Sequence, residues 1–341
     1  MLFVGRSTVR RASAQGRPGT DLGSRWGFRR MRIQALRFGA WAFVLLGTAG
    51  LTGAGARATA AEPLRWTFHQ GESLKYSLEQ KMTMSTKANG VERKSNRNHT
   101  LNFNWTVLAV EPSGEARIRH KTERIRMKAD EPPLLPFQFD SAETKGDPPG
   151  FEGMARILRA EAGAEFTFRM TPTGEIIDIE IPAETLKRYK DAMPEGRPGG
   201  GEVNEKAVKE NLMQASPPAF PANPIDAGQT WSARPSRVPL MEPPIATLIL
   251  DRTFTYQGPD PRSPASRLIG VQTTARVEPI PGVDFKITIR KQDGHGTMTL
   301  DTSSGHVSST QLSLNMELVV NAQGQSIEQT SDSSSTMTLQ P

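Results

Sequence analysis

Apolar and polar side chains alternate over residues 296–320, on both sides of a Ser-Ser-Gly turn. A period of two places successive side chains on opposite faces of a strand, so each strand has one buried and one solvated face. Residues 301–305 suit a tight turn, and the two strands are predicted to pair as an antiparallel hairpin. The predicted buried face carries Leu312, Leu314, Met316 and Leu318, and the predicted outer face carries Ser313, Asn315 and Glu317.

A similar hairpin is predicted over residues 74–107. Apolar residues alternate on both sides of Asn89-Gly90, a dipeptide that tolerates the positive φ values of a type I′ turn. Three segments, residues 149–163, 182–193 and 202–215, are instead predicted to form short helices. The expected fold class is therefore mainly β (α+β), with long antiparallel hairpins in one or two curved sheets and two or three short helices in the middle of the chain.

The N-terminal segment resembles an export leader. Residues 31–61 contain Arg32 and Arg37, an apolar run, and small residues at 58 and 60, which is typical of a signal peptide cut after Ala60 or Ala61. We therefore expect an exported protein of the periplasm or the cell exterior, with no stable membrane span after cleavage. The expected organisation is a leader over 1–61, a β-rich half with the helices over 62–217, and a second β-rich half over 218–341, divided at a Pro-rich stretch.

Charge and cysteine content limit the function classes. The ten Arg and one Asp of residues 1–61 account for more than the net charge of +6, and the remainder of the chain carries −3. A nucleic-acid partner is therefore not expected. A run of six basic residues is predicted to be the solvated face of a strand: Arg117, Arg119, Lys121, Arg124, Arg126 and Lys128. The chain has no cysteine, which excludes disulfides and thiolate chemistry.

Four segments of the sequence are similar to those of a known group of proteins. The segments "LRWTFHQGESLKY", "FPANPIDAGQTW", "GTMTLDTSSGHV" and "GQSIEQTSDSSSTMTL" resemble uncharacterised exported β-rich bacterial proteins of the planctomycete-like type, over most of residues 62–341. The resemblance implies a β-rich exported fold and carries no catalytic residue. The architecture is also similar, by distant analogy, to periplasmic lipoprotein-carrier and lipid-binding half-barrels.

No catalytic or metal motif stands out in the sequence. The five histidines form no close ligand pair, and no G-x-S-x-G or S-x-x-K occurs. No cofactor and no metal are expected, although Asp293, His295 and Asp301 lie near one hairpin. The Ser and Thr residues near the C-terminus are expected on a polar outer strand face. A hydrolase would need His120, His295, Asp178 and Asp293 to converge in one cleft.

The apolar strand faces suggest a ligand-binding surface. Methionine and aromatic side chains would line the concave side if the sheet curls: Met82, Met84, Phe103, Trp105, Phe166, Phe168, Met170, Met298 and Met316. The alternative is a core covered by the central helices. The first function hypothesis is a non-enzymatic protein that binds an apolar or envelope-derived ligand. The second is an interaction module that docks an envelope protein, and the third is a hydrolase without a recognisable motif.

Overall fold

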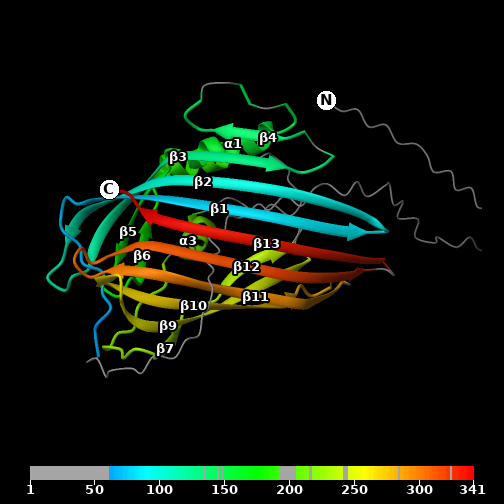
Figure 1. Ribbon diagram of the computed structural model, residues 1–341. Helices are drawn as coiled ribbons and strands as arrows, with labels where there is room; N and C mark the ends of the chain where they lie inside the picture. Colours follow the sequence, from blue (N-terminus) through cyan, green and yellow to red (C-terminus); the bar gives the residue numbers. More distant parts are fainter. Residues whose placement is uncertain are drawn as a thin grey trace, which may run out of the picture. The chain divides into compact units, whose positions relative to one another are not determined.

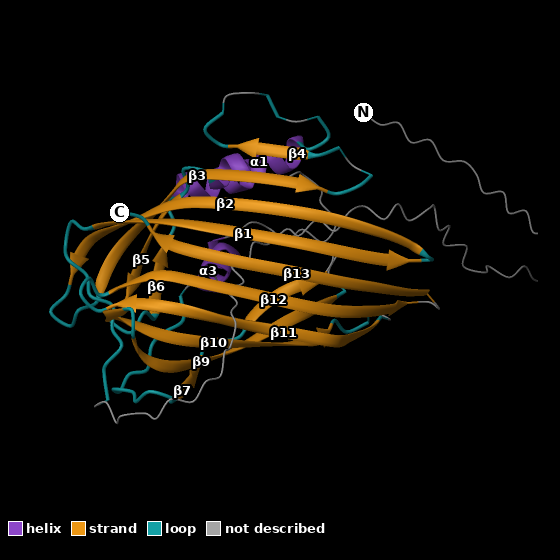
Figure 2. Cartoon of the chain, in the orientation of Figure 1, coloured by secondary structure: helices purple, strands orange, loops and turns teal. Residues whose placement is uncertain are grey.

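The alternating segments form a single antiparallel sheet of thirteen strands (Figure 1). The computed structural model describes residues 61–133, 135–143, 146–147, 149–192, 205–214, 217–240, 245–282, 285–322 and 325–341. The leader predicted over 1–61 therefore lies outside the described residues, except for Ala61. The fold class is confirmed as mainly β with three short helices in the described part of the chain (Figure 2).

The strands differ greatly in length, and the longest belong to the predicted hairpins. In chain order they are β1 (Ser73–Ala88), β2 (Val91–Val110), β3 (Ala116–Asp130), β4 (Phe137–Asp140), β5 (Glu165–Met170), β6 (Ile176–Glu180), β7 (Thr230–Ser232), β8 (Ser236–Leu240), β9 (Ala246–Asp260), β10 (Ser263–Pro279), β11 (Lys286–Asp301), β12 (His306–Ala322) and β13 (Gln325–Leu339). The helices are α1 (Glu152–Glu161), α2 (Ala183–Ala192) and α3 (Glu205–Gln214), all within segments predicted to be helical.

The strand order joins the beginning and the end of the described chain. It runs β6-β5-β3-β2-β1-β13-β12-β11-β10-β9-β7, with β4 also paired to β3 and β8 to β9. β1 and β13 pair from Tyr76↔Leu339 to Ala88↔Ile327. Strands from both predicted halves therefore belong to one sheet, and the expected boundary at 217/218 falls on the segment between α3 and β7.

Both predicted hairpins form. Asn89 and Gly90 connect β1 to β2 with φ values of 50° and 76°, the left-handed conformation that a type I′ turn needs. On β12 the residues Leu312, Leu314, Met316 and Leu318 are all 7% exposed or less, which confirms the predicted buried face. We call the face that carries these four residues the inner face of the sheet.

The basic residues of β3 are exposed as predicted. Their spacing changes between Lys121 and Arg124 because a bulge there pairs Asn102 with Arg124 and Phe103 with Thr122.

The serines of β13 were expected on the outer face, and this was wrong for part of the strand. Ser331, Ser333 and Ser335 pair with Met316, Leu314 and Leu312 and therefore lie on the inner face.

The segment of residues 62–70, which precedes β1, closes one end of the sheet. Trp66 N–H donates to Pro172 O in the β5–β6 turn (2.7 Å), and Thr67 N–H donates to Gly305 O in the β11–β12 turn (3.0 Å). In a flat sheet these two turns would lie at least five strand spacings apart, about 24 Å. Trp66 and Thr67, which bond to them, are consecutive residues, and their Cα atoms are only about 3.8 Å apart. The sheet must therefore curl around this closing segment.

The closing segment fills the curled end with apolar side chains. Leu64, Trp66 and Phe68 are 1%, 2% and 6% exposed, and the Trp66 ring packs 5.9 Å from that of Trp105 and 6.4 Å from that of Phe220. They belong to one continuous core that includes residues of β1, β2, β3, β5, β9, β10, β11 and β12. This burial anchors the curl because large aromatic side chains contribute most to core stability.

Helices α1 and α2 cover part of the inner face beside β3 and β4. Phe137 on β4 lies opposite Ala129, and its ring packs 4.9 Å from that of Phe151, just before α1. In α2 the Arg188 guanidinium donates to Ala162 O (2.8 Å), just after α1, and Thr185 donates to Glu165 O (3.0 Å). Leu212 of α3 packs against the same core. The helices thus leave the far end of the long strands less covered.

Candidate functional site: the open half of the inner face

All nine residues predicted to line a concave surface lie on the inner face. Six of them are buried at 7% exposure or less, and they belong to the closed core: Phe103, Trp105, Phe168, Met170, Met298 and Met316. Met82, Met84 and Phe166 are half-buried. Met82 and Met84 are neighbours on β1, whereas Phe166 lies on β5 against the ring of His120. The sheet thus brings the nine residues to one face but divides them between a filled part and an accessible part.

The inner face has a closed half, next to the closing segment, and an open half, towards the β1–β2 turn. Buried positions end along β1 at Leu78, while the inner-face residues that follow it on this strand remain partly accessible. On β2 the same change follows His99, since Arg97 and Ser95 are half-buried, and on β13 Ser333 and Gln329 are half-buried although Ser331 between them is buried. We define the open half by ten half-buried inner-face residues: Met82, Met84, Thr86, Ser95, Arg97, Ile287, Ile289, Ile327, Gln329 and Ser333.

A row of polar side chains separates the two halves. Gln80 on β1 is opposite His99 on β2 and Ser335 on β13. The His99 ring Nδ1 lies 3.4 Å from Gln80 Oε1, and burial together with the Arg97 charge lowers the pKa of His99 to about 4. Ser335 is 3% exposed, and its Oγ has no hydrogen-bond partner among the described residues. Polar groups at this depth cost free energy unless they are satisfied, so on β1 and β2 this row marks where the apolar core ends, while on β12 the core continues through Leu318.

The open half has an apolar side and a polar side. On β9 to β12 the inner-face residues of this region are largely apolar: Val277, Ile287 and Ile289 are half-buried, and Leu248, Leu318 and Val320 are buried, while Arg252, Thr273 and Gln292 are polar. On β13, β1 and β2 the inner face carries hydroxyl, amide and guanidinium groups beside the two methionines: Thr86, Arg93, Ser95, Arg97, Gln329, Ser331 and Ser333. A surface of this kind offers apolar contact and hydrogen bonding side by side.

The polar side includes an ion pair that is largely withdrawn from solvent. Arg97 Nη2 contacts Glu131 Oε1, and the two side chains are 13% and 17% exposed. Arg97 Nε is buried and has no hydrogen-bond partner among the described residues. Arg93 lies on the same face of β2, four residues closer to the β1–β2 turn than Arg97, and is exposed. β2 thus holds two guanidinium groups along this side, and Glu131, just after β3, adds one carboxylate.

The residues that a hydrolase would need do not converge. His120 lies on the inner face, with its ring 5.0 Å from that of Phe103 and 4.5 Å from that of Phe166, and burial lowers its pKa to about 3. His295 bonds Asp293 at 2.8 Å, but its register with Ser313 places it on the outer face of β11. Asp178 is exposed on β6. Histidines on opposite faces of a sheet cannot share one cleft. In the described part of the chain there is no cluster of three or more His, Asp or Glu suited to a metal ion.

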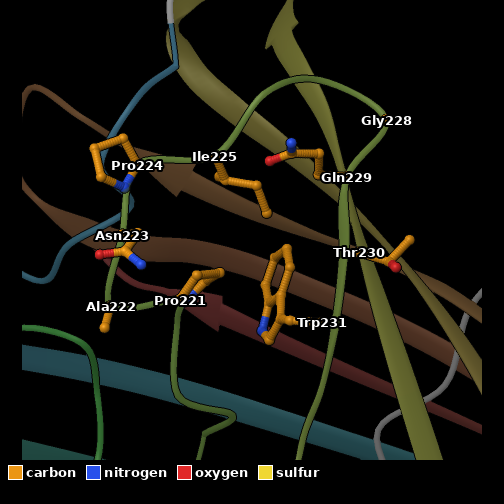
Figure 3. Close-up of a pocket in the computed structure, with 9 residues that line it drawn as sticks. All are labelled: Pro221, Ala222, Asn223, Pro224, Ile225, Gly228, Gln229, Thr230 and Trp231. Carbon is orange, nitrogen blue, oxygen red and sulfur yellow. The ribbon is translucent and has the colours of Figure 1, made fainter.

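A concavity of about 500 Å³ lies in the loop before and within β7 (Figure 3). Figure 3 shows the ring of Trp231 between the two arms of the loop, beside Pro221 and below Ile225. Trp231 Nε1 donates to Ala219 O (3.0 Å), and the Arg65 guanidinium donates to Pro221 O (2.7 Å). The lining residues described include no ionisable group and none of the nine predicted residues. These bonds fix the loop, so we regard the concavity as a product of how the loop is anchored.

Sequence reasoning missed the polar part of the site. Period-two patterns assign polar residues to the outer face, so Arg97, Ser333 and Gln329 gave no signal. The one usable clue was parity within β2, where Arg97 is separated by an even number of residues from the apolar Leu101 and Phe103. In β13 both faces are polar, so parity within that strand carries no information.

Comparisons with known proteins give weak similarities in structure only. No family model and no curated protein matches this chain. A lipovitellin structure titled "Lipid-protein interactions in lipovitellin" matches with a TM-score of 0.44 and 13% identity, over 80% of this chain and 25% of that one. DynF from the dynemicin biosynthesis pathway of Micromonospora chersina matches with a TM-score of 0.22 and 10% identity, over 87% and 93% of the two chains. This chain thus spans about a quarter of the lipovitellin chain. The helices described here are too short or too polar to cross a membrane.

Proposed function

We propose that the protein is a non-enzymatic binding protein that holds the apolar part of a small amphiphile against the open half of its inner face. One observation carries the proposal. Met82, Met84, Ile287 and Ile289 keep half-buried apolar surface on a face whose apolar residues are mostly buried in the core. Partly covered apolar surface next to polar groups is the usual composition of a ligand site.

The methionines suit such a role. Their unbranched side chains adapt to ligands of different shape, and Met84 Sδ accepts a hydrogen bond from Gln329 Nε2 at 2.9 Å, which holds it beside the polar side. Because the predicted leader over 31–61 is typical of export, we propose the periplasm or the cell exterior as the site of action. The amphiphile would then be an envelope-derived molecule.

Binding of a fluorescent long-chain fatty acid to the purified chain tests the proposal. Met82→Glu introduces a carboxylate on the inner face, and we expect it to weaken binding about tenfold or more. The matched control is Thr83→Glu, since the next residue on β1 is exposed on the outer face and should leave binding unchanged. If the wild-type protein does not bind, or if both variants bind like wild type, the proposal is wrong. An interaction module of the envelope would then be the better explanation of the fold.

A further inference from the structure

The charged groups of the open half are not balanced. Of the charged residues that the described strands and their flanking residues place on this part of the inner face, Arg93, Arg97 and the buried Arg252 of β9 are cations, and Glu131 is the anion beside Arg97. Both arginines lie on β2 with Ser95 between them, so three donors follow one another along the same face at every second residue. The polar side therefore has one net positive charge next to an apolar surface.

Glu131 leaves part of the Arg97 guanidinium unused. It contacts Nη2, while Nε has no hydrogen-bond partner among the described residues although it is buried. A guanidinium carries five N–H donors in a planar fork that matches a carboxylate or a phosphate. Because an unmade bond at a buried donor costs free energy, an anionic acceptor that reached this side chain would recover it.

The positions of the two arginines and of the apolar residues fit one amphiphile. Thr86 on β1 is opposite Arg93, and Met82 is opposite Arg97, so the head of a ligand at the arginines lies against β1 and β2. From β2 the sheet continues through β1 and β13 to the apolar residues of β12, three strand spacings or about 14 Å away. A long hydrocarbon chain can cover this distance, starting along the half-buried side chains of Met82 and Met84.

We propose that Arg93 and Arg97 bind the anionic head group of a long-chain amphiphile, whose hydrocarbon chain lies across β1 and β13 towards β12. This inference rests on the proposed function and adds the charge class of the ligand. The shared chemistry is an oxyanion, which a fatty acid supplies as a carboxylate and a lysophosphatidic acid as a phosphate.

The test compares ligands that share one chain and differ in the head. Oleate, 1-oleoyl lysophosphatidic acid and oleyl alcohol are titrated against the full-length protein in competition with a fluorescent fatty acid. We expect the two anions to bind about tenfold or more tightly than the alcohol. A preference for one of the anions identifies which oxyanion the site takes.

Three substitutions separate head-group binding from folding. Arg93→Gln and Arg97→Gln should each weaken oleate binding about tenfold while changing the affinity for oleyl alcohol less than twofold. Glu131→Gln should act in the opposite direction and tighten oleate binding, since it releases the Arg97 guanidinium from its carboxylate. The control is Lys81→Gln, an exposed cation on the outer face of β1, which should leave both affinities unchanged.

The outcomes distinguish this inference from the proposal on which it rests. If oleate and oleyl alcohol bind equally well, or if Arg93→Gln weakens both to the same extent, binding by the arginines is wrong and the apolar site remains. If none of the three ligands binds, the proposed function itself is wrong.

Discussion

At the scale of a residue, His120 shows how the inner face fixes the ionisation state of a side chain. Its ring lies between two phenylalanine rings, and Trp105 Nε1 donates to His120 Nδ1 at 3.1 Å. This bond requires a neutral ring with Nδ1 unprotonated. Burial lowers the pKa of His120 to about 3, and burial acts in the same direction on His99.

The folded protein should therefore lose stability in mild acid. Both histidines have a lower pKa in the folded than in the unfolded chain, where it is about 6.5. Their contribution is fully present above pH 6.5 and is lost as the pH falls towards the folded values, with His120 alone accounting for about 2 kcal/mol at pH 5. Urea unfolding at pH 7 and pH 5 measures this loss. His120→Phe should be less stable at pH 7, because Trp105 loses its acceptor, but should show a smaller decrease between the two pH values. An unchanged decrease would contradict the assignment.

At the scale of an element, the β11–β12 hairpin allows a sharp test of the face assignment. Leu314 is 5% exposed among the core residues, while Ser313 lies on the outer face opposite Ser334. Leu314→Asp buries a carboxylate without a partner and should cost several kcal/mol of unfolding free energy, whereas Ser313→Asp should change it by less than about 0.5 kcal/mol. Chemical denaturation of the two variants gives both values. Similar losses in both would show that the strand faces are assigned wrongly.

The hairpins were predictable because each rests on local information. Asn89-Gly90 fixes the first turn, and alternation fixes the faces of β1, β2 and β12 and of β11 from Gly296 to Leu300, although β11 also has a register shift between Ile289 and Lys291. The bulge in β3 was not predictable, since Glu123 looks like any polar residue of an exposed strand. The pairing of β1 with β13 was not predictable either, because β13 has few apolar residues and pairing over such a sequence separation leaves no local pattern. The same holds for the candidate site: its methionines follow a local pattern and were predicted, whereas its polar side has no such pattern and was missed.

At the scale of the whole sheet, the two halves expected from the sequence share a core and a central strand pair. Pairing of β1 with β13 extends over thirteen residue pairs, and the closing segment bonds turns from both halves. We therefore expect one cooperative unfolding transition. Hydrogen exchange followed by mass spectrometry in increasing denaturant should show β2 and β10 losing protection at the same concentration. Earlier loss in one of them would indicate halves that fold independently.

The pairing of β1 with β13 also determines the order in which the sheet is completed. During synthesis β1 appears before every other strand of the sheet, and its partner β13 appears after all of them. Until β13 is available, one edge of β1 and one edge of β12 present unpaired backbone groups that can join with other chains. Closure over this sequence separation is slow because the loop entropy must be overcome before the pair forms. We therefore expect a nascent chain of this protein to expose two open strand edges until β13 pairs, and these edges favour aggregation while they remain unpaired.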